Sequence, residues 1–306
     1  MRDPLALEQS ASPLPARGAR QLGALQLILV RLLRRKGALI GALFLLLLGG
    51  LVVCAPLVTP EDPYNPLSWD VFSQNLSPRL EPMWYYALGT NAGGQSVLVQ
   101  ILWGARVSLS IGLIGALSAM VVGVAVGGVA GYFGGPIETA LMRVTDVFLV
   151  LPFLAVVICA ARIFGATDFW ALERIFAVFS WPTIARHTRA VYVGLREEGY
   201  VEAARAIRVR EWRIAVRHVL PNALGSIVVA GTLTAANCIT AEAAIDFFRL
   251  GLQYPDSSWG TVMMASQSMN AVPWWVTAFP GIVLAATVLA INAVGGGLDS
   301  ALDVRS

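Results

Sequence analysis

Six apolar stretches, separated by polar segments, organise this chain of 306 residues. Each is at least about 20 residues long, which is what a helix needs to cross the hydrocarbon core of a bilayer. The pattern therefore predicts an all-α polytopic membrane protein with six transmembrane helices. The stretches cover residues 37–60, 107–137, 139–164, 169–190, 224–247 and 274–297.

The composition agrees with a membrane protein. The chain is 57% hydrophobic and 13% charged, whereas soluble domains carry about 25% charged residues. The two histidines, His187 and His218, form no metal-ligand spacing, and the three cysteines lie far apart, so neither a metal site nor a disulfide framework is predicted. The only lysine, Lys36, precedes a glycine rather than serine or threonine. This excludes a P-loop ATPase.

The basic residues predict the orientation of the chain. If residues 1–36, Arg143, residues 186–217 and the C-terminal tail face the cytosol, 17 of the 22 lysine and arginine residues lie inside. This bias satisfies the positive-inside rule. Both termini are therefore expected in the cytosol, and residues 61–104 and 248–273 are expected to form extracytoplasmic loops.

The domain organisation follows from this topology. Residues 1–36 are expected to form a cytosolic tail whose last part, residues 22–35, is amphipathic and lies on membrane lipid. Residues 37–306 are expected to form one transmembrane domain. Its cytosolic connection, residues 195–222, contains the most arginine-rich segment of the chain.

Glycines recur at near-helical spacing in the second apolar stretch. Small residues on one stripe allow helices to approach closely in lipid, where packing drives association. The second span is therefore expected in the interior of the bundle, and the glycine-rich residues 131–136 are expected to form the turn that follows it. The glycines are Gly112, Gly115, Gly123, Gly127 and Gly131.

The polar segment 199–222 is expected to begin with a short helix near Tyr200. Glu202 lies in its first turn, where an acidic group suits the helix dipole. Ala203 and Ala204 follow and leave a smooth surface on which a partner packs closely. A solvated charged loop without a partner is the alternative interpretation.

A second short helix is expected over residues 211–220, with Pro221 ending it. Its apolar residues recur at i, i+3, i+4 and i+7, which predicts a single apolar stripe. The two helices would form a helix–turn–helix at the cytosolic face of the membrane. The stripe consists of Trp212, Ala215, Val216 and Val219.

The tripeptide Glu202-Ala203-Ala204, followed by Trp212 and Pro221, resembles the EAA loop of ABC importer permeases. Further motifs resemble the C-type permease subunit of the dipeptide/oligopeptide (and nickel) family, in the same order and at similar spacing. They are LGT at 88–90, GARVS at 104–108, GYFGG at 131–135, EAA at 242–244, LG at 250–251, SWG at 258–260 and ALD at 301–303.

The resemblance implies a type I ABC importer permease fold in the bacterial cytoplasmic (inner) membrane. It implies a non-catalytic subunit with no catalytic residue, bound metal or cofactor of its own, since ATP and Mg²⁺ would bind two cytosolic ATPase subunits. A homologous second permease would complete the pathway, and an extracytoplasmic binding protein would deliver di- or oligopeptides. Nickel or another small solute is the alternative cargo. A secondary transporter and an intramembrane enzyme are weaker alternatives, and nucleic acid is not an expected partner.

The resemblance also implies that the 199–222 loop docks on an ATPase subunit and couples ATP binding to the spans. Asp146, Glu242 and Trp259 match family positions in or near the spans, and they are candidates for a pathway or a structural role. The residues carried over to coupling are Tyr200, Glu202, Ala203, Ala204, Arg205, Arg208, Trp212 and Pro221.

Arg208 departs from the family pattern, because glycine is usual at this turn between the two coupling helices. Left-handed backbone costs a residue with a side chain about 1 kcal/mol or more. We therefore expect Arg208 to keep a negative φ.

Two other regions also depart from the pattern. Asp246 and Arg249 replace small residues at the exit of the fifth span, and their i, i+3 spacing favours an ion pair. In the outer segment, three positions that are charged in the family are uncharged here. They are Asn91, Gln95 and Ser96.

Overall fold

The computed structural model describes residues 35–58, 88–91, 96–165, 167–253, 257–264 and 273–302. Several predicted segments lie outside the described part. They include the expected N-terminal tail except its last two residues, most of the first outer loop with Gln95, and the last four residues. Within the described ranges the chain is helical, and the only β pairing is an isolated bridge between Thr90 and Ser96.

Four helices of the described residues are long and apolar enough to cross a membrane. A fifth span results if α4 and α5, which are bent by 85° at their junction, are counted as one broken span. The four long helices are α2 (Lys36–Val58), α3 (Val97–Phe133), α10 (Leu220–Phe247) with the turns before it, and α12 (Trp274–Leu302).

The difference from six expected spans arises because the third and fourth apolar stretches are interrupted. The third is divided into α4 (Gly135–Val150) and α5 (Phe153–Phe164), and the fourth into α6 (Phe169–Phe179) and α7 (Trp181–Leu195). Pro152 lies at the first interruption, where a proline cannot continue the hydrogen bonding of the helix before it. Hydrophobicity along the chain does not reveal such bends.

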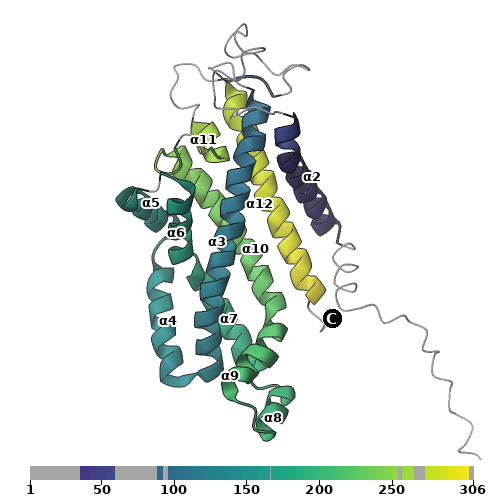
Figure 1. Ribbon diagram of the computed structural model, residues 1–306, viewed down its shortest axis with the longest axis vertical. Helices are drawn as coiled ribbons and strands as arrows, with labels where there is room; N and C mark the ends of the chain where they lie inside the picture. Colours follow the sequence, from purple (N-terminus) through teal and green to yellow (C-terminus); the bar gives the residue numbers. More distant parts are fainter. Residues whose placement is uncertain are drawn as a thin grey trace, which may run out of the picture.

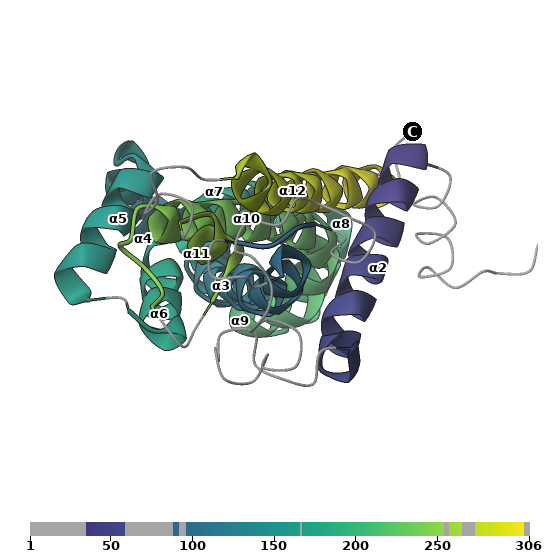
Figure 2. The ribbon, with the colours of Figure 1, turned by 90° about the horizontal axis from the view of Figure 1, so that it is seen from above.

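The helices form an elongated bundle (Figure 1). Seen from above, α5 and α6 lie at one edge and α2 at the other, with α3 and α10 between them (Figure 2). The short helix α8 (Gly199–Ala206) projects from one end of the bundle, which we call the α8 end.

Both described ends of the chain lie toward the α8 end. Gly41 of α2 lies against the backbone of Ala290 in α12, whereas Val52 packs in the same cluster as Trp275, so α2 and α12 are antiparallel. The last residue of α12, Leu302, contacts the position of Gly225 near the start of α10. Two ends on the same side of the bundle fit an even number of membrane crossings. The cytosolic location of the α8 end remains a prediction.

The glycine stripe of α3 packs against other helices, which confirms the interior position predicted for it. A Cβ atom on Gly131 would lie 2.7 Å from the carbonyl oxygen of Arg189, and one on Gly123 would lie 2.8 Å from Cβ of Ile184. One on Gly115 would lie 3.2 Å from the sulfur of Cys238 in α10. The glycines therefore let the backbones of α3 and α7 touch.

The predicted turn after α3 is also present. It is shorter than the predicted residues 131–136, because α3 continues to Phe133 and α4 begins at Gly135. Gly134 and Gly135 have φ of 69° and 61°, values that favour glycine, and α4 runs back beside α3.

The outer loops differ from their predicted bounds. The helix α3 begins at Val97, so the last residues of the expected loop 61–104 are helical. The expected loop 248–273 contains a short helix, α11 (Trp259–Met264). It docks on α3 at Gly104, where a Cβ atom would lie 2.9 Å from the backbone of Ser258.

Replacing Gly127 by alanine tests the α3–α7 contact. Its Cβ would lie 2.8 Å from Cβ of Thr188, so we expect Gly127→Ala to lower the free energy of unfolding by about 1–3 kcal/mol through overpacking. Thermal unfolding of the purified protein in detergent measures the effect. Gly50→Ala is the matched control, because nothing lies within 4 Å of its Cβ position. Equal stability of both variants would contradict the close contact.

Candidate coupling site at the α8 end

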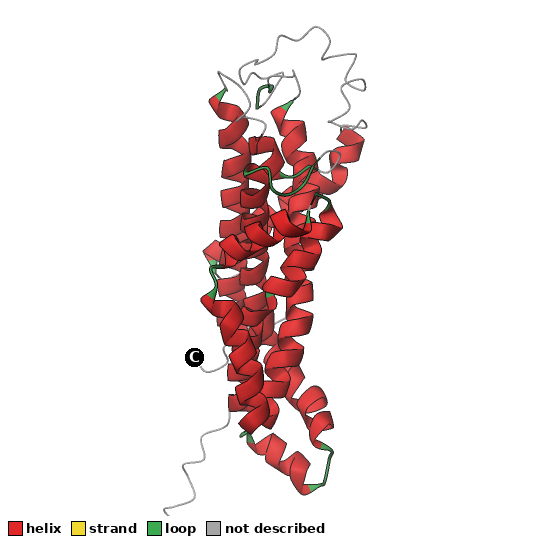
Figure 3. Ribbon diagram, turned by 90° about the vertical axis from the view of Figure 1, so that its left-hand side faces the viewer, coloured by secondary structure: helices red, strands yellow, loops and turns green. Residues whose placement is uncertain are grey.

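The connection between α7 and α10 is a helix–turn–helix, as predicted, and we call residues Gly199 to Ile214 the tip. It consists of α8, a short turn and α9 (Glu211–Ile214), and it lies at one extreme of the molecule (Figure 3). Glu202 occupies the first turn of α8, where the helix dipole favours an acidic group.

The second helix of the tip does not end at Pro221, and that prediction is wrong. After α9 the chain forms a π-helical turn, Ala215–Val219, and continues directly into α10, with Pro221 in its first turn. Proline is accommodated there because a π-helical turn already displaces the ordinary i→i−4 bonds that a proline would break.

The apolar stripe predicted for this helix is also split. Ala215 and Val219 are buried, but Trp212 is 55% and Val216 is 56% exposed. The buried residues instead recur at Ile214, Val219, Ala223 and Ile227. Their spacing is five and then four residues, as expected when a π-helical turn inserts one residue into an α-helical pattern.

The two alanines after Glu202 point in different directions. Ala204 is buried and packs in one cluster with Val201 and Ile214, whereas Ala203 is exposed. Only Ala203 is therefore open to a partner, which stays a prediction, and Ala204 instead joins the two helices of the tip.

Arg208 has φ of 57°, so the prediction of a negative φ is wrong. The reason is the way in which α8 ends. The N–H of Arg208 donates to the carbonyl of Arg205 at 2.9 Å, and the N–H of Val209 donates to the carbonyl of Ala204 at 3.2 Å. These two bonds form a Schellman motif, which requires left-handed backbone at this position whatever the side chain.

Arg249 repeats this arrangement at the end of α10. Its φ is 62°, its N–H donates to the carbonyl of Asp246 at 2.9 Å, and that of Leu250 donates to Ile245 at 3.0 Å. The carboxylate of Asp246 accepts from the N–H of Leu252 at 2.7 Å and from the hydroxyl of Ser258 at 2.5 Å. The predicted Asp246–Arg249 ion pair is therefore wrong, because the carboxylate is buried and turned toward the segment before α11.

Arg205 binds within the chain although its side chain is 40% exposed. Its Nε lies 3.3 Å from both carboxylate oxygens of Glu211, and its guanidinium lies 5.9 Å from the ring centre of Tyr132. The hydroxyl of Tyr132 donates to the same carboxylate. These three side chains hold the tip against the end of α3. No spacing in the sequence indicated Tyr132, because it lies far from the tip along the chain.

Tyr200 connects α8 to the start of α10. Burial raises the pKa of its hydroxyl above the usual value, and the side chain of Asn222 forms a hydrogen bond with it. The hydroxyl therefore stays protonated at neutral pH and can donate.

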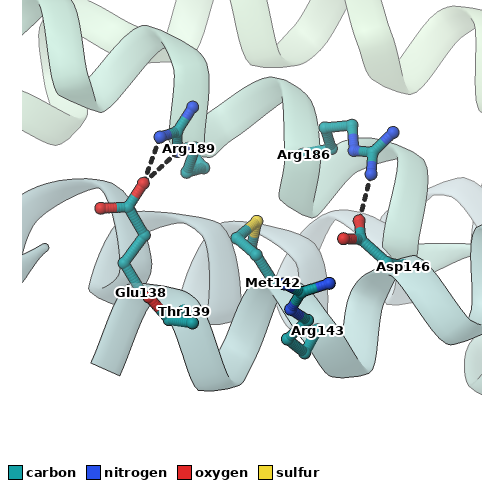
Figure 4. Close-up of a pocket in the computed structure, with 7 residues that line it drawn as sticks. All are labelled: Glu138, Thr139, Met142, Arg143, Asp146, Arg186 and Arg189. Atoms are coloured by element: carbon teal, nitrogen blue, oxygen red, sulfur yellow. Dashed lines mark hydrogen bonds and ion pairs between the residues drawn. The ribbon is translucent and has the colours of Figure 1, made fainter. Parts of the chain in front are cut away.

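Asp146 lies between α4 and α7 and forms an ion pair with Arg186 (Figure 4). Two turns before it on α4, Glu138 pairs with Arg189 in the same way. Both pairs are partly exposed, and such pairs contribute about 0–1 kcal/mol each. They fix the register of α4 against α7, so the structure gives Asp146 a structural contact.

The other two pathway candidates, Glu242 and Trp259, are fully buried. The indole N–H of Trp259 donates to the carbonyl of Ile101 at 3.0 Å, and its backbone N–H donates to Ser108 at 3.2 Å. Trp259 thus joins α11 to α3. Neither side chain lines an open passage in this conformation.

Comparison with known proteins identifies the family of this chain. Residues 123–305 match the family model of the binding-protein-dependent transport system inner membrane component. Residues 23–82 match the N-terminal TM domain of oligopeptide transport permease C. This chain belongs to the family of inner-membrane components of binding-protein-dependent transport systems.

Several relatives match this permease over most of their length. The dipeptide transport system permease protein DppC of Bacillus subtilis is 34% identical, over 90% of this chain and 84% of that protein. The oligopeptide transport system permease protein OppC of Mycobacterium tuberculosis is 36% identical, over 92% and 94%. The glutathione transport system permease protein GsiD of Pectobacterium atrosepticum is 32% identical, over 90% and 89%.

The fold is that of a solved ABC transporter. An inward-facing structure of the MetNI methionine ABC transporter contains a chain that superposes with a TM-score of 0.56 at 19% identity. The match covers 67% of this permease and 97% of that chain.

Replacing Arg208 by glycine tests the left-handed turn. Glycine removes the steric cost of positive φ, so we expect Arg208→Gly to raise the free energy of unfolding by about 1 kcal/mol. Arg213→Gly is the control, since Arg213 lies in α9 and glycine in a helix destabilises by about 0.5–1 kcal/mol. Thermal unfolding of both variants should therefore shift in opposite directions, and a loss of stability in Arg208→Gly would contradict the assignment.

Proposed function

We propose that this permease is the non-catalytic C-type subunit of an ATP-driven importer of di- or oligopeptides. It forms half of the translocation pathway, and a homologous second permease forms the other half. Two cytosolic ATPase subunits bind ATP and Mg²⁺, and an extracytoplasmic binding protein delivers the peptide. The names of the relatives, which include dipeptide, oligopeptide and glutathione permeases, support this class of cargo.

The observation that carries the coupling role is the exposed apolar surface of the tip. Ile207, in the turn after α8, is 77% exposed, and Trp212 in α9 is 55% exposed, although the tip is otherwise polar and lies at the extreme end of the bundle. Ala203, which follows Glu202 in the sequence, is exposed as well. Large apolar side chains left exposed at such a position are typical of a protein-binding surface, and an ATPase subunit at this end is the partner we propose.

The contacts behind this surface support a mechanical role. Val201, Ala204 and Ile214 join the two helices of the tip, and the Tyr132–Glu211–Arg205 cluster ties the tip to α3. A displacement of the tip by the ATPase is therefore transmitted to the bundle rather than absorbed by a loose loop. This is a two-state element that nucleotide binding can bias.

Charge reversal at Glu202 tests the docking. We expect Glu202→Arg to lower ATPase activity stimulated by the binding protein by about tenfold, equivalent to about 1.4 kcal/mol of coupling, in the reconstituted four-subunit complex. Glu197→Arg is the matched control, because Glu197 is exposed just before α8 and makes only a 3.9 Å contact with Arg196. Equal activity of the two variants would contradict a specific role for Glu202.

A further inference from the structure

Two helix breaks border one hollow that opens on the side of the bundle. Leu151 at the α4–α5 break and Ser180 at the α6–α7 break both line a hollow of about 420 Å³, whose remaining wall is one face of α10. None of the described residues that line it is charged. The wall includes Phe148, Phe179, Ser180, Thr183, Thr234 and Asn237.

The hollow lies at a similar distance from the α8 end along each of the helices α4, α7 and α10. The 16 residues of α4 put its break about 24 Å from the turn at Gly134. The 15 residues of α7 put Ser180 about 22 Å from its other end. Asn237 lies about 25 Å along α10 from Leu220 and about 15 Å before Phe247. Since the hydrocarbon core is about 30 Å thick, the hollow lies within the membrane.

The polar groups at this depth require a wet or polar environment. The side chains of Asn237 and Thr183 are exposed, and no hydrogen bond within the described part of the chain involves either one. Leu151 and Pro152 are exposed in extended backbone. Irregular backbone and unpaired amides at membrane depth occur where they line a water-filled cavity or are covered by protein, not where they face lipid.

The geometry points to this hollow as the place where the transported solute contacts this chain, an inference that rests on the proposed function. The carboxamide of Asn237 offers two donors and an acceptor, and the hydroxyl of Thr183 offers one of each. These groups match the N–H and C=O of a peptide bond. The rings of Phe148 and Phe179, whose centres are 5.9 Å apart, form an apolar wall for side chains.

This chemistry defines the class of solute. The hollow binds the amide backbone of a short peptide and does not select for side-chain charge, because its own wall is uncharged. The three earlier pathway candidates lie elsewhere: Asp146 pairs with Arg186, and Glu242 and Trp259 are buried.

Thiol labelling tests whether the hollow is open to water. The assembled complex in lipid nanodiscs, with Cys54, Cys159 and Cys238 replaced by serine or alanine, receives single cysteines at residues 237, 183 or 289. Leu289 is the control, since it is exposed but lies on the apolar surface of α12. Water-soluble methanethiosulfonate needs a thiolate in water, so we expect residues 237 and 183 to react about tenfold or more faster than residue 289. Equal, slow reaction at all three positions would overturn the proposal and would indicate lipid or a helix of the second permease against this face.

Transport assays test whether the hollow contacts the solute. We expect Asn237→Leu to lower the uptake of labelled trialanine by about tenfold per intact complex, the effect of losing one buried hydrogen bond, and Asn237→Gln to restore most of it. Undiminished uptake in Asn237→Leu would overturn the proposal. If the wild-type complex hydrolyses ATP but imports no peptide, the proposed cargo is wrong. If it imports trialanine and Asn237→Leu does so equally, only the role of the hollow is wrong.

Discussion

The close contact between α3 and α7 is the constraint on which the rest of the structure depends. Glycines at three successive levels of α3 allow its backbone to touch that of α7, so the two helices are held at a fixed spacing and register. Helices in lipid gain nothing from hydrophobic burial against each other, and such packing is a main source of their association. The α8 end depends on this pair, because α7 leads into the tip and α3 supplies Tyr132, which contacts Glu211 of the tip.

The tip and the hollow are connected through α7 and α10. The helix α7 begins beside the hollow, at Ser180 and Thr183, and ends just before α8. On the other side, α9 continues through the π-helical turn into α10, which carries Asn237 past the same hollow. Both helices of the tip therefore lead directly to the membrane interior. Under the proposed coupling, a displacement of the tip would therefore act on two walls of the hollow.

Much of the fold was predictable because lipid imposes strong rules. Long uncharged stretches located α2, α3, α10 and α12, and the glycine spacing identified α3 as an interior helix. The broken helices escaped prediction, because hydropathy measures how apolar a stretch is and not whether it is straight. The hollow was missed for the same reason, since an uncharged residue such as Asn237 attracts no notice until two breaks are seen beside it.

The site shows how backbone geometry can override side-chain preference. Steric cost alone predicted a negative φ for Arg208, but the two hydrogen bonds that close α8 require a left-handed residue there, and Arg249 repeats the case at the end of α10. The carboxylate of Asp246 likewise binds Ser258 instead of the nearby arginine. In each instance tertiary and local hydrogen bonds, which pairwise sequence spacing does not encode, decided the outcome.

The most direct test of the central claim is whether movement of the tip reaches the hollow. An environment-sensitive fluorophore attached at residue 183 of the reconstituted complex reports on the wall formed by α7. The account predicts that its emission shifts when ATP binds and that Glu202→Arg abolishes the shift while leaving the complex assembled. An ATP-induced shift of the same size in Glu202→Arg, or no shift in the labelled complex that retains Glu202, would contradict the account.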